Sequence, residues 1–475
     1  MAAQHTMRQG EGSARAFDTS SAALVAARFM LASVTSSRPA MQAPPALAPV
    51  NVPGDDGACS PGWLPHFRGL RAMVAVAEQG TVVGAAEVLH LSQPAVTRAL
   101  RGLEDVLGFA LFERGARGML PTPAGRILTE RARRAFSELE QASASITMLA
   151  GAGRKAQGQR FAAMVAPHLL DSLVAVAEQG SGPQAGHKLG RSQPTVHRNL
   201  AELEHLAGVV LFNRTAFGTR LTEAGETLLC GVKRALASLA VAHEELSAFD
   251  GRLTAQVRIG ALPLSIGVLV PQAVDRLLGA FPHLHVTIVD GTYDALVQQL
   301  RRAEIDLIVG ALRPLGAPRD LVQEPLFQDR LMLVARAGHP CLSQPPPCLA
   351  ELVDHAWIVP LPQTPARLVF ERLFQSADLP LPAARLQVNS PALVRTLLLG
   401  SDRLALLSPL QIEAELRSGQ LAVVPLPGLN ASRTIGASTR LGASLSPAVL
   451  ALLDELRAVA GQFAATLSGP LLRAD

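Results

Sequence analysis

The sequence predicts two tandem all-α winged helix-turn-helix domains followed by an α/β domain of two lobes. The first observation is a repeat: VAVAEQG occurs at residues 74–80 and again at 174–180, and the 52 residues that start at 74 match those that start at 174 at 26 positions without a gap. The second is a change of pattern near residue 252, where short apolar strands begin to alternate with amphipathic helices. A chain of 475 residues is long enough for several such domains.

The composition narrows the class of protein. A net charge of +4 permits binding to nucleic acid. No apolar run reaches the roughly 18 residues of a membrane helix, so we expect a cytoplasmic protein with no membrane partner. The four cysteines show no CxxC spacing and no nearby histidine cluster, which indicates reduced thiols rather than a metal site. Residues 1–65 are rich in Ala, Ser and Pro, and are expected to be a disordered tail or the product of a start placed too far upstream.

The first copy, residues 66–125, has the pattern of two short helices joined by a tight turn. Ala85 and Leu89 lie on one apolar face of the first helix, and Val96, Leu100 and Leu103 recur at i, i+4 and i+7 in the second. These apolar positions must face a small core. Such a pair is a helix-turn-helix, whose second helix can enter the major groove of DNA.

The second helix of the pair has a polar outer face. Ser92 stands at the N-cap position, where its hydroxyl is expected to accept a free backbone amide. Pro94 falls in the first turn, where its missing N–H has no helical partner to lose. The face opposite the apolar positions carries Gln93, Thr97 and Arg98, and its first residues would point toward base edges.

The segment after this helix predicts a wing and a linker. Arg114 and Arg117 bracket a glycine-containing hairpin in LFERGARGMLPTPAG, where arginines can meet phosphates or a narrow minor groove. Residues 126–158 then read as a long linker helix with an alternating-charge surface.

An AxxAA-like spacing followed in order by SQPAVTR, LE, LG, LFER and TPAG resembles the amino-terminal domain of LysR-type transcriptional regulators. The resemblance covers residues 66–150. It implies promoter DNA as a partner, RNA polymerase as a further candidate, and a linker helix that joins the subunits of a homodimer or homotetramer. An isolated helical pair with a solvated polar face is the alternative, which the wing and the motif order disfavour. The candidate DNA-contacting residues of this copy are Ser92, Gln93, Pro94, Thr97, Arg98, Arg114 and Arg117.

The second copy, residues 161–225, keeps the apolar positions but departs from the first elsewhere. Its first helix holds Gly182 and Gly186, each of which lowers helix stability by about 1 kcal/mol in an interior. His197 replaces Thr97, and Phe217 replaces the second arginine of the wing. The candidate DNA-contacting residues here are Gln193, Pro194, His197, Arg198 and Arg214.

The balance of charged residues predicts that the two copies differ in their affinity for DNA. Residues 66–150 hold 10 Arg against 8 acidic residues, whereas residues 161–249 hold 7 Lys plus Arg against 8 acidic residues. Because phosphate neutralisation dominates affinity for DNA, the first copy is expected to carry most of the binding while the second packs, spaces or assists. Residues 226–250 read as a second linker helix. A dimer would present four helix-turn-helix units, and the sequence leaves open which linker pairs the subunits.

Residues 252–465 predict the two-lobed α/β domain. Runs such as VRIGAL, VTIVDG and IDLIVGAL alternate with amphipathic helices, which is typical of parallel sheets buried on both faces. Two such sets indicate two lobes, with a ligand held between them at strand ends and helix starts. This half resembles the effector-binding half of LysR-type regulators, which is periplasmic-binding-protein-like in fold.

The resemblance places a cleft at five short segments. Ser265 and Thr364 fall at expected helix starts, where backbone amides favour an anion, and Arg313 would add a charge-assisted contact. Ordinary N-capping and a surface arginine are the alternative. A small metabolite effector, such as a sugar acid or an aromatic acid, is the hypothesis, with no other cofactor. The candidate effector-binding residues are Pro263, Leu264, Ser265, Gly291, Thr292, Arg313, Gln363, Thr364, Asn389 and Ser390.

Two rival functions compete with that of a DNA-binding regulator. An enzyme is disfavoured because there is no phosphate-binding loop, GxSxG or HExxH motif, and because His339 and His355 have no evident Ser or Cys partner. A ligand sensor that has lost DNA binding and acts through protein contacts is disfavoured by the intact SQPAVTR motif and wing. The expected mechanism is that the effector biases the angle between the lobes and hence the spacing of the DNA-binding heads.

Overall fold

The computed structural model describes most of the chain after residue 65. The described ranges are 66–115, 118–149, 156–215, 218–247, 255–267, 269–313, 316–342 and 346–467. The expected tail, Arg117 and Phe217 lie outside them. The first linker helix was expected over residues 126–158, but it is described only as far as Leu149, and residues 156–158 belong to a separate helix. Within the described residues, no helix is both long enough and apolar enough to cross a bilayer.

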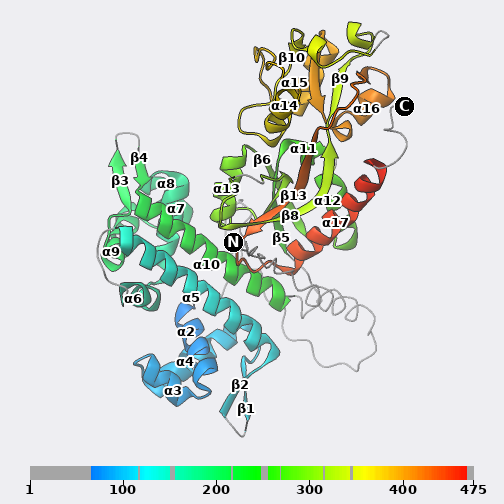
Figure 1. Cartoon of the computed structure of the whole chain (residues 1–475). Coiled ribbons are helices and arrows are strands. Elements are labelled where there is room, and N and C mark those ends of the chain that lie inside the picture. The colour runs from blue at the N-terminus through cyan, green and yellow to red at the C-terminus, as the bar shows by residue number, and fades with distance from the viewer. Residues whose placement is uncertain are drawn as a thin grey trace, which may run out of the picture. The chain divides into compact units, whose positions relative to one another are not determined.

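The first copy folds as a helix-turn-helix with a two-stranded wing (Figure 1). Its elements are α2 (Phe67–Gln79), α3 (Val82–Val88), α4 (Gln93–Leu107), β1 (Phe112–Gly115), β2 (Gly118–Pro121) and α5 (Pro123–Leu149). Val96, Leu100 and Leu103 are buried, as their spacing predicted. Helix α2 crosses α4 closely at Gly69, where an added Cβ would lie 2.9 Å from the Ala99 carbonyl oxygen.

The second copy has the same six elements in the same order, preceded by one further helix, α6. They are α6 (Ala156–Met164), α7 (Pro167–Gln179), α8 (Gly182–Leu189), α9 (Gln193–Ala207), β3 (Phe212–Thr215), β4 (Gly218–Leu221) and α10 (Glu223–Ser247). The glycines of α8 do not prevent a helix. A Cβ on Gly186 would lie 2.7 Å from the Arg191 carbonyl oxygen, so the tight turn after α8 depends on that glycine.

Equivalent contacts recur in both copies at a separation of one hundred residues. The Glu104 carboxylate accepts from the backbone N–H of Leu111 at 2.8 Å, and Glu204 accepts from Leu211 at 2.8 Å. The ion pair of Arg133 with Glu78 is likewise matched, by that of Lys233 with Glu178. The two copies therefore share equivalent hydrogen bonds and ion pairs as well as similar sequences.

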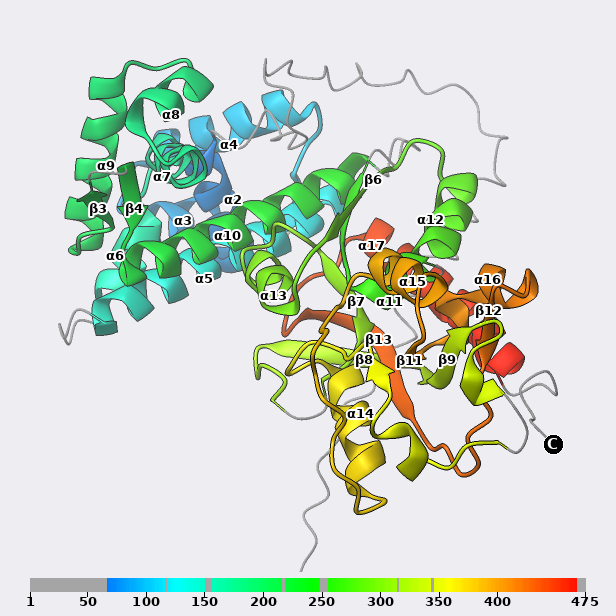
Figure 2. The same cartoon turned by 90° about the horizontal axis from the view of Figure 1, so that it is seen from above.

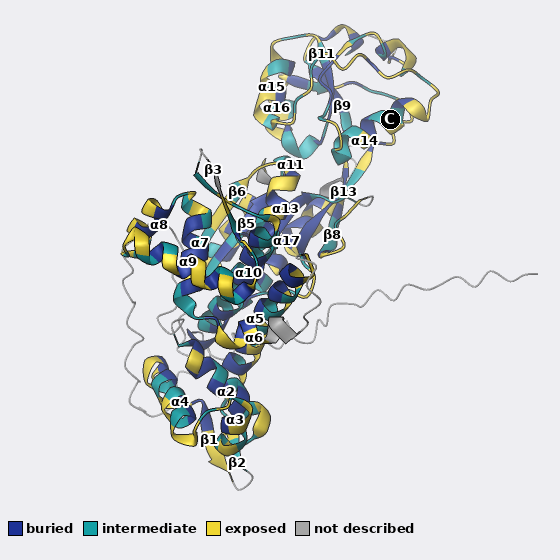
Figure 3. Cartoon of the chain, turned by 90° about the vertical axis from the view of Figure 1, so that its left-hand side faces the viewer, coloured by how far each residue is buried: buried dark blue, intermediate teal, exposed yellow. Residues whose placement is uncertain are grey.

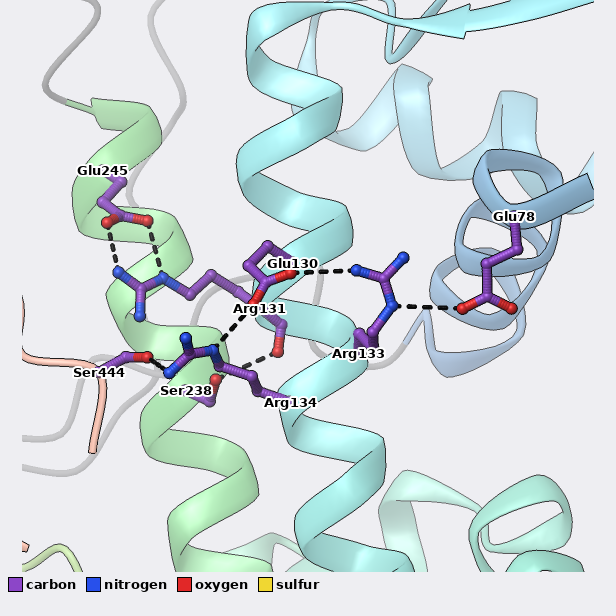
Figure 4. A network of polar contacts seen from close by, with 8 residues as sticks. All are labelled: Glu78, Glu130, Arg131, Arg133, Arg134, Ser238, Glu245 and Ser444. Atoms are coloured by element: carbon purple, nitrogen blue, oxygen red, sulfur yellow. Dashed lines mark hydrogen bonds and ion pairs between the residues drawn. The ribbon is translucent and has the colours of Figure 1, made fainter. Parts of the chain in front are cut away.

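Helices α5 and α10 pack side by side along much of their lengths (Figures 1 and 2). Buried residues of both helices belong to one apolar core, which also takes in α2 and α7. Figure 4 shows polar contacts along this pair: Arg131 forms an ion pair with Glu245, and its carbonyl oxygen accepts from Ser238. The sequence leaves open which linker pairs the subunits; in the structure, the two linkers of one chain pack against each other.

The carboxyl half contains two sheets. The five-stranded sheet has the order β6-β5-β7-β13-β8, and the four-stranded sheet has the order β10-β11-β9-β12. The first lobe comprises β5 (Gln256–Ala261), α11 (Pro263–Gly267), α12 (Leu269–Ala280), β6 (His285–Asp290), α13 (Tyr293–Arg301), β7 (Leu307–Ala311), β8 (Leu321–Arg330), β13 (Ser432–Arg440) and α17 (Pro447–Leu467).

The second lobe is inserted between β8 and β13. Its elements are β9 (Met332–Arg336), η2 (Pro340–Leu342), η3 (Ala350–Leu352), β10 (Ala356–Trp357), α14 (Pro365–Gln375), α15 (Pro391–Leu399), β11 (Arg403–Leu407), η4 (Pro409–Gln411), α16 (Glu413–Arg417) and β12 (Leu421–Val423). Its core gathers Trp357, Phe370 and Phe374 in edge-to-face and tilted contacts.

The expectation of parallel sheets is only partly correct. Strand β5 pairs in parallel with β6 and β7, but β13 runs antiparallel to both β7 and β8, and β9 runs antiparallel to β11 and β12. The reason is the path of the chain: β8 leads out of the first lobe and β13 returns to it, so the two connecting strands run in opposite directions. Apolar content alone does not distinguish such a returning strand from a parallel one.

Candidate nucleic-acid interface and effector cleft

Helix α4 presents the expected polar face to solvent. Gln93, Pro94 and Arg98 are exposed and Thr97 is half-buried, while the apolar residues on the opposite side anchor the helix in the core. The face is therefore free to meet a groove without unfolding any part of the domain. The positions that the sequence picked out lie together on one surface.

The expectation that the Ser92 hydroxyl caps α4 is wrong. Ser92 occupies the N-cap position of α4 with extended backbone, but its side chain makes no capping hydrogen bond. The cap of the preceding helix is made instead: Thr81 accepts from the Gly84 N–H at 3.1 Å. The Ser92 carbonyl oxygen instead accepts from the Ala95 N–H at 2.9 Å, so the exposed Ser92 hydroxyl is not used by the cap.

The wing is held against the start of α3. The Met119 N–H donates to the Gly80 carbonyl oxygen at 2.8 Å, and a Cβ on Gly118 would lie only 2.4 Å from that oxygen. Gly80 itself ends α2 with a φ of 68°, a left-handed conformation that favours glycine. This close approach places the exposed Arg114 on β1 beside α3.

The second copy presents a similar but less uniform face. Gln193, Pro194 and Arg198 are exposed on α9, whose outer side is prominent in Figure 3, whereas His197 is half-buried. The His197 ring lies beside Gly182 of α8 and 3.5 Å from the Gln193 amide nitrogen. The side chain of Arg214 lies outside the described part of the chain.

A buried polar contact that the sequence did not reveal holds α9 against α7. The Asn199 amide donates to the Ser172 hydroxyl at 2.9 Å. The first copy has alanines at the equivalent positions, 99 and 72. The spacing of apolar residues predicts which positions are buried, but it does not predict a buried hydrogen bond between two polar side chains.

In the carboxyl half, the structure brings together Arg313, Gln363 and a residue that the sequence analysis missed, Tyr293. The Arg313 guanidinium lies 3.9 Å from the centroid of the Tyr293 ring and donates to the Gln363 carbonyl oxygen at 2.9 Å. Gln363 has a φ of 62°, a strained conformation for a residue with a side chain. Burial raises the pKa of the Tyr293 phenol, and Arg313 partly offsets this shift. The signal for Tyr293 was available, because it is the chain's one tyrosine and directly follows Thr292.

Several cleft candidates are N-caps of helices. Thr292, Thr364 and Ser390 accept from backbone amides of α13, α14 and α15 at 3.3, 3.2 and 3.5 Å. The helix start at Thr364 was expected from the sequence, whereas those at Thr292 and Ser390 were not. Gly291 and Asn389, which precede two of the caps, are exposed.

Ser265 does not present its hydroxyl to an anion. It is fully buried, and its hydroxyl donates to the carbonyl oxygens of Val309 and Leu262 at 2.5 and 2.9 Å. It therefore ties α11 to β7 rather than marking an anion site. Pro263 begins α11 and is half-buried, and the side chain of Leu264 lies outside the described part of the chain.

The expectation that His355 has no cysteine partner is wrong. His355 does have a cysteine partner: its Nε2 lies 3.1 Å from the Cys341 Sγ, while its Nδ1 is 3.1 Å from the Glu351 carbonyl oxygen. Cys341 is 8% exposed, and burial raises the pKa of its thiol. A nucleophilic cysteine needs the opposite shift, so the Cys341 thiol forms a packed hydrogen bond with the His355 ring rather than acting as a nucleophile.

Comparison with known proteins agrees with this two-part architecture. The profile described as "Bacterial regulatory helix-turn-helix protein, lysR family" matches residues 67–126 and again 167–226, and "LysR substrate binding domain" matches residues 250–461. The HTH-type transcriptional regulator GalR of Pseudomonas putida is 36% identical over 396 residues, which cover 83% of this chain and 98% of that protein. The chain belongs to the LysR family of transcriptional regulators.

Other LysR-type relatives match a shorter part of the chain. The HTH-type transcriptional regulator PcaQ of Agrobacterium fabrum is 30% identical over 296 residues, or 62% of this chain and 94% of that protein. The GalR match is longer by 100 residues, which equals the spacing of the two copies. A full-length OxyR variant from Pseudomonas aeruginosa superposes with a TM-score of 0.50 at 22% identity, over 61% of this chain and 93% of that one.

These matches confirm the predicted fold class and the type of protein. The chain is a LysR-type, DNA-binding transcriptional regulator with an effector-binding domain. As in this family generally, its partners are promoter DNA, a small-molecule effector and further copies of the regulator.

Proposed function

We propose that the exposed face of α4 reads base edges in the major groove, with Gln93, Thr97 and Arg98 as the contacting side chains. The observation that carries this is that all three lie on the side of α4 away from the core. Gln suits adenine and Arg suits guanine through paired hydrogen bonds. Arg114 on the wing then contacts the phosphate backbone.

The second copy plays a lesser part in affinity. Its α9 keeps Gln193, Pro194 and Arg198 exposed, so it can approach DNA in the same way. Residues 161–249, however, hold 7 Lys plus Arg against 8 acidic residues, whereas residues 66–150 hold 10 Arg against 8 acidic residues. Since affinity follows phosphate neutralisation, the first copy contributes the larger share.

The effector is a small carboxylate, such as a sugar acid or an aromatic acid, held near Arg313 and the helix starts at Thr292, Thr364 and Ser390. Backbone amides and dipoles at three helix starts favour a negative group. Arg313 and Tyr293 supply a cation and an aromatic face beside them. Such a ligand would replace the Gln363 carbonyl as the acceptor of the Arg313 guanidinium.

The chain acts in the cytoplasm as a regulator without catalytic activity of its own. The Cys341 thiol is buried and protonated, which supports a structural role for the one Cys–His pair found among the described residues. Steady turnover of a bound ligand would overturn this part of the proposal.

An electrophoretic shift with the gene's own upstream region tests DNA binding. The complex should form at low salt and weaken steeply as salt rises, because cations such as Arg114 replace counterions on phosphates. Arg98→Ala should weaken it strongly, while Arg319→Ala, an equal loss of charge at an exposed position of the effector half, should not. Absence of any retained duplex would favour the alternative of a ligand sensor that acts through protein contacts.

A further inference from the structure

The two linker helices of one chain form an antiparallel pair. Arg131 of α5 forms an ion pair with Glu245, Glu138 forms one with Arg234 at 2.9 Å, and Ala142 lies against Gly231. Residue numbers thus rise along α5 as they fall along α10.

The contacts of this pair are reciprocal. The Ser238 hydroxyl donates to the Arg131 carbonyl oxygen at 3.1 Å, and a Cβ built on Gly231 would lie 3.1 Å from the Glu138 carbonyl oxygen. Positions 231 and 238 of α10 correspond to 131 and 138 of α5 in the repeat. Position 238 of α10 thus meets position 131 of α5, and position 231 of α10 meets position 138 of α5. Exchanging the two helices turns one contact into the other, as expected for an interface with two-fold symmetry.

The paired face is apolar and closely packed. Ala135, Leu139 and Ala142 of α5 are at most 2% exposed, as are Ala235, Leu239 and Ala242 of α10. All six belong to one core. The surface that a linker helix would offer to a second chain is thus already filled by the same chain.

The antiparallel arrangement separates the two DNA-binding heads. Each head precedes its own linker helix, and the amino-terminal ends of α5 and α10 lie at opposite ends of the pair. A helix of 27 residues is about 40 Å long. This is on the scale of the 34–36 Å between successive major grooves on one side of B-DNA.

We propose that a single chain is a complete two-headed DNA-binding module that occupies both halves of an inverted-repeat site. This rests on the proposed contact of α4 with DNA and extends it: α9 occupies the second half-site, related to the first by the pseudo-two-fold axis of the α5–α10 pair. Additional copies in the assembly then join through surfaces other than this pair.

The occupied DNA site is an imperfect inverted repeat. Gln93 and Arg98 have identical counterparts in Gln193 and Arg198, so both halves share the bases that these side chains read. Thr97 corresponds to His197 in the repeat, so the halves differ at the base pair that this position contacts. A symmetric dimer of single-headed chains would have no reason for this difference.

Cross-linking of the full chain tests whether the pair forms within one chain. Glu138→Cys with Arg234→Cys replaces an ion pair that is about one-third exposed, a change of about 0–1 kcal/mol in stability. Normal and isotopically heavy preparations of this variant are unfolded together in urea, refolded as a mixture and treated with a bismaleimide, and the peptides joining 138 to 234 are identified by mass spectrometry. Glu138→Cys alone is the matched control, since it cannot form this link.

We expect only light–light and heavy–heavy links in the mixture. Mixed light–heavy links at the statistical proportion would show that the pair forms between chains and would overturn the inference. Absence of the 138–234 link in either form would also overturn it, because the two positions would then not be adjacent.

Footprinting on the gene's upstream region separates this inference from DNA binding itself. At one bound chain per duplex, measured by mass photometry, both half-sites should be protected. Arg98→Ala should open one half and Arg198→Ala the other. Protection of a single half-site by one chain would overturn the two-headed module while leaving DNA binding intact, whereas loss of all protection in the unmodified chain would overturn the DNA contact on which it rests.

Discussion

The contact between Gly231 and Ala142 allows the packing of α5 on α10 to be tested by one methyl group. A Cβ added to Gly231 would lie 2.3 Å from the Ala142 Cβ, a distance that real carbon atoms do not reach, so Gly231→Ala must push the helices apart. Overpacking of this kind destabilises a core by about 1–3 kcal/mol. Against this, alanine stabilises a helix interior by about 1 kcal/mol over glycine.

A matched control isolates the packing contribution. Gly461 lies within α17 with nothing inside 4 Å of an added Cβ, so Gly461→Ala gains helix propensity without a clash. Both variants gain the same helix propensity, so this gain cancels when the free energy of unfolding of one is subtracted from that of the other. Gly231→Ala should therefore be less stable than Gly461→Ala by about 1–3 kcal/mol in urea unfolding followed by circular dichroism.

A double-mutant cycle identifies the partner. Ala142→Gly removes the obstructing methyl, so the double variant with Gly231→Ala should be more stable than the two single effects predict when added, by about 1–3 kcal/mol. Equal stability of the two Gly→Ala variants, or additive effects at 142 and 231, would refute the packing described for the linker helices.

Three further predictions follow from the site and from burial. Arg98→Ala should weaken binding to the upstream duplex more than Arg198→Ala, as measured by anisotropy titration, and equal losses would contradict the unequal roles of the two copies. Arg313→Met should abolish the thermal shift given by a carboxylate effector while Arg319→Met preserves it, and an undiminished shift would exclude Arg313 from the site. Burial raises the pKa of Glu244 from 4.5 to about 7, so the folded chain retains a proton that the unfolded chain releases, and stability should fall by about 2–3 kcal/mol as pH rises from 4.5 through 7. Glu244→Gln should flatten this decline in urea unfolding at pH 5 and pH 8, and an unchanged pH profile would contradict the burial of that carboxyl group.

The sequence predicted the features that repeat or follow a period. The duplication, the buried stripe of Val96, Leu100 and Leu103, and the exposed position of Arg98 all follow from spacing along one helix. The helix start at Thr364 follows from local chemistry. Each of these depends on neighbours only a few residues away.

The features that the sequence did not reveal depend on distant residues. The direction of β13 is set by where the chain re-enters the first lobe, and Ser265 is buried because β7 supplies a carbonyl acceptor 44 residues away. The thiol–imidazole contact joins Cys341 of η2 to His355, which precedes β10. The pairing of the linkers within one chain was equally hidden, since both helices carry the same apolar spacing and would fit each other in either one chain or two.

The most direct measurement is the ratio of affinities for the upstream duplex and for a scrambled duplex of the same length and composition. Base reading by α4 predicts that Gln93→Ala lowers this ratio about 5- to 150-fold, the equivalent of 1–3 kcal/mol, while binding to the scrambled duplex stays the same. An unchanged ratio would show that Gln93 does not contact the bases, and would contradict the assignment of α4 as the helix that reads DNA.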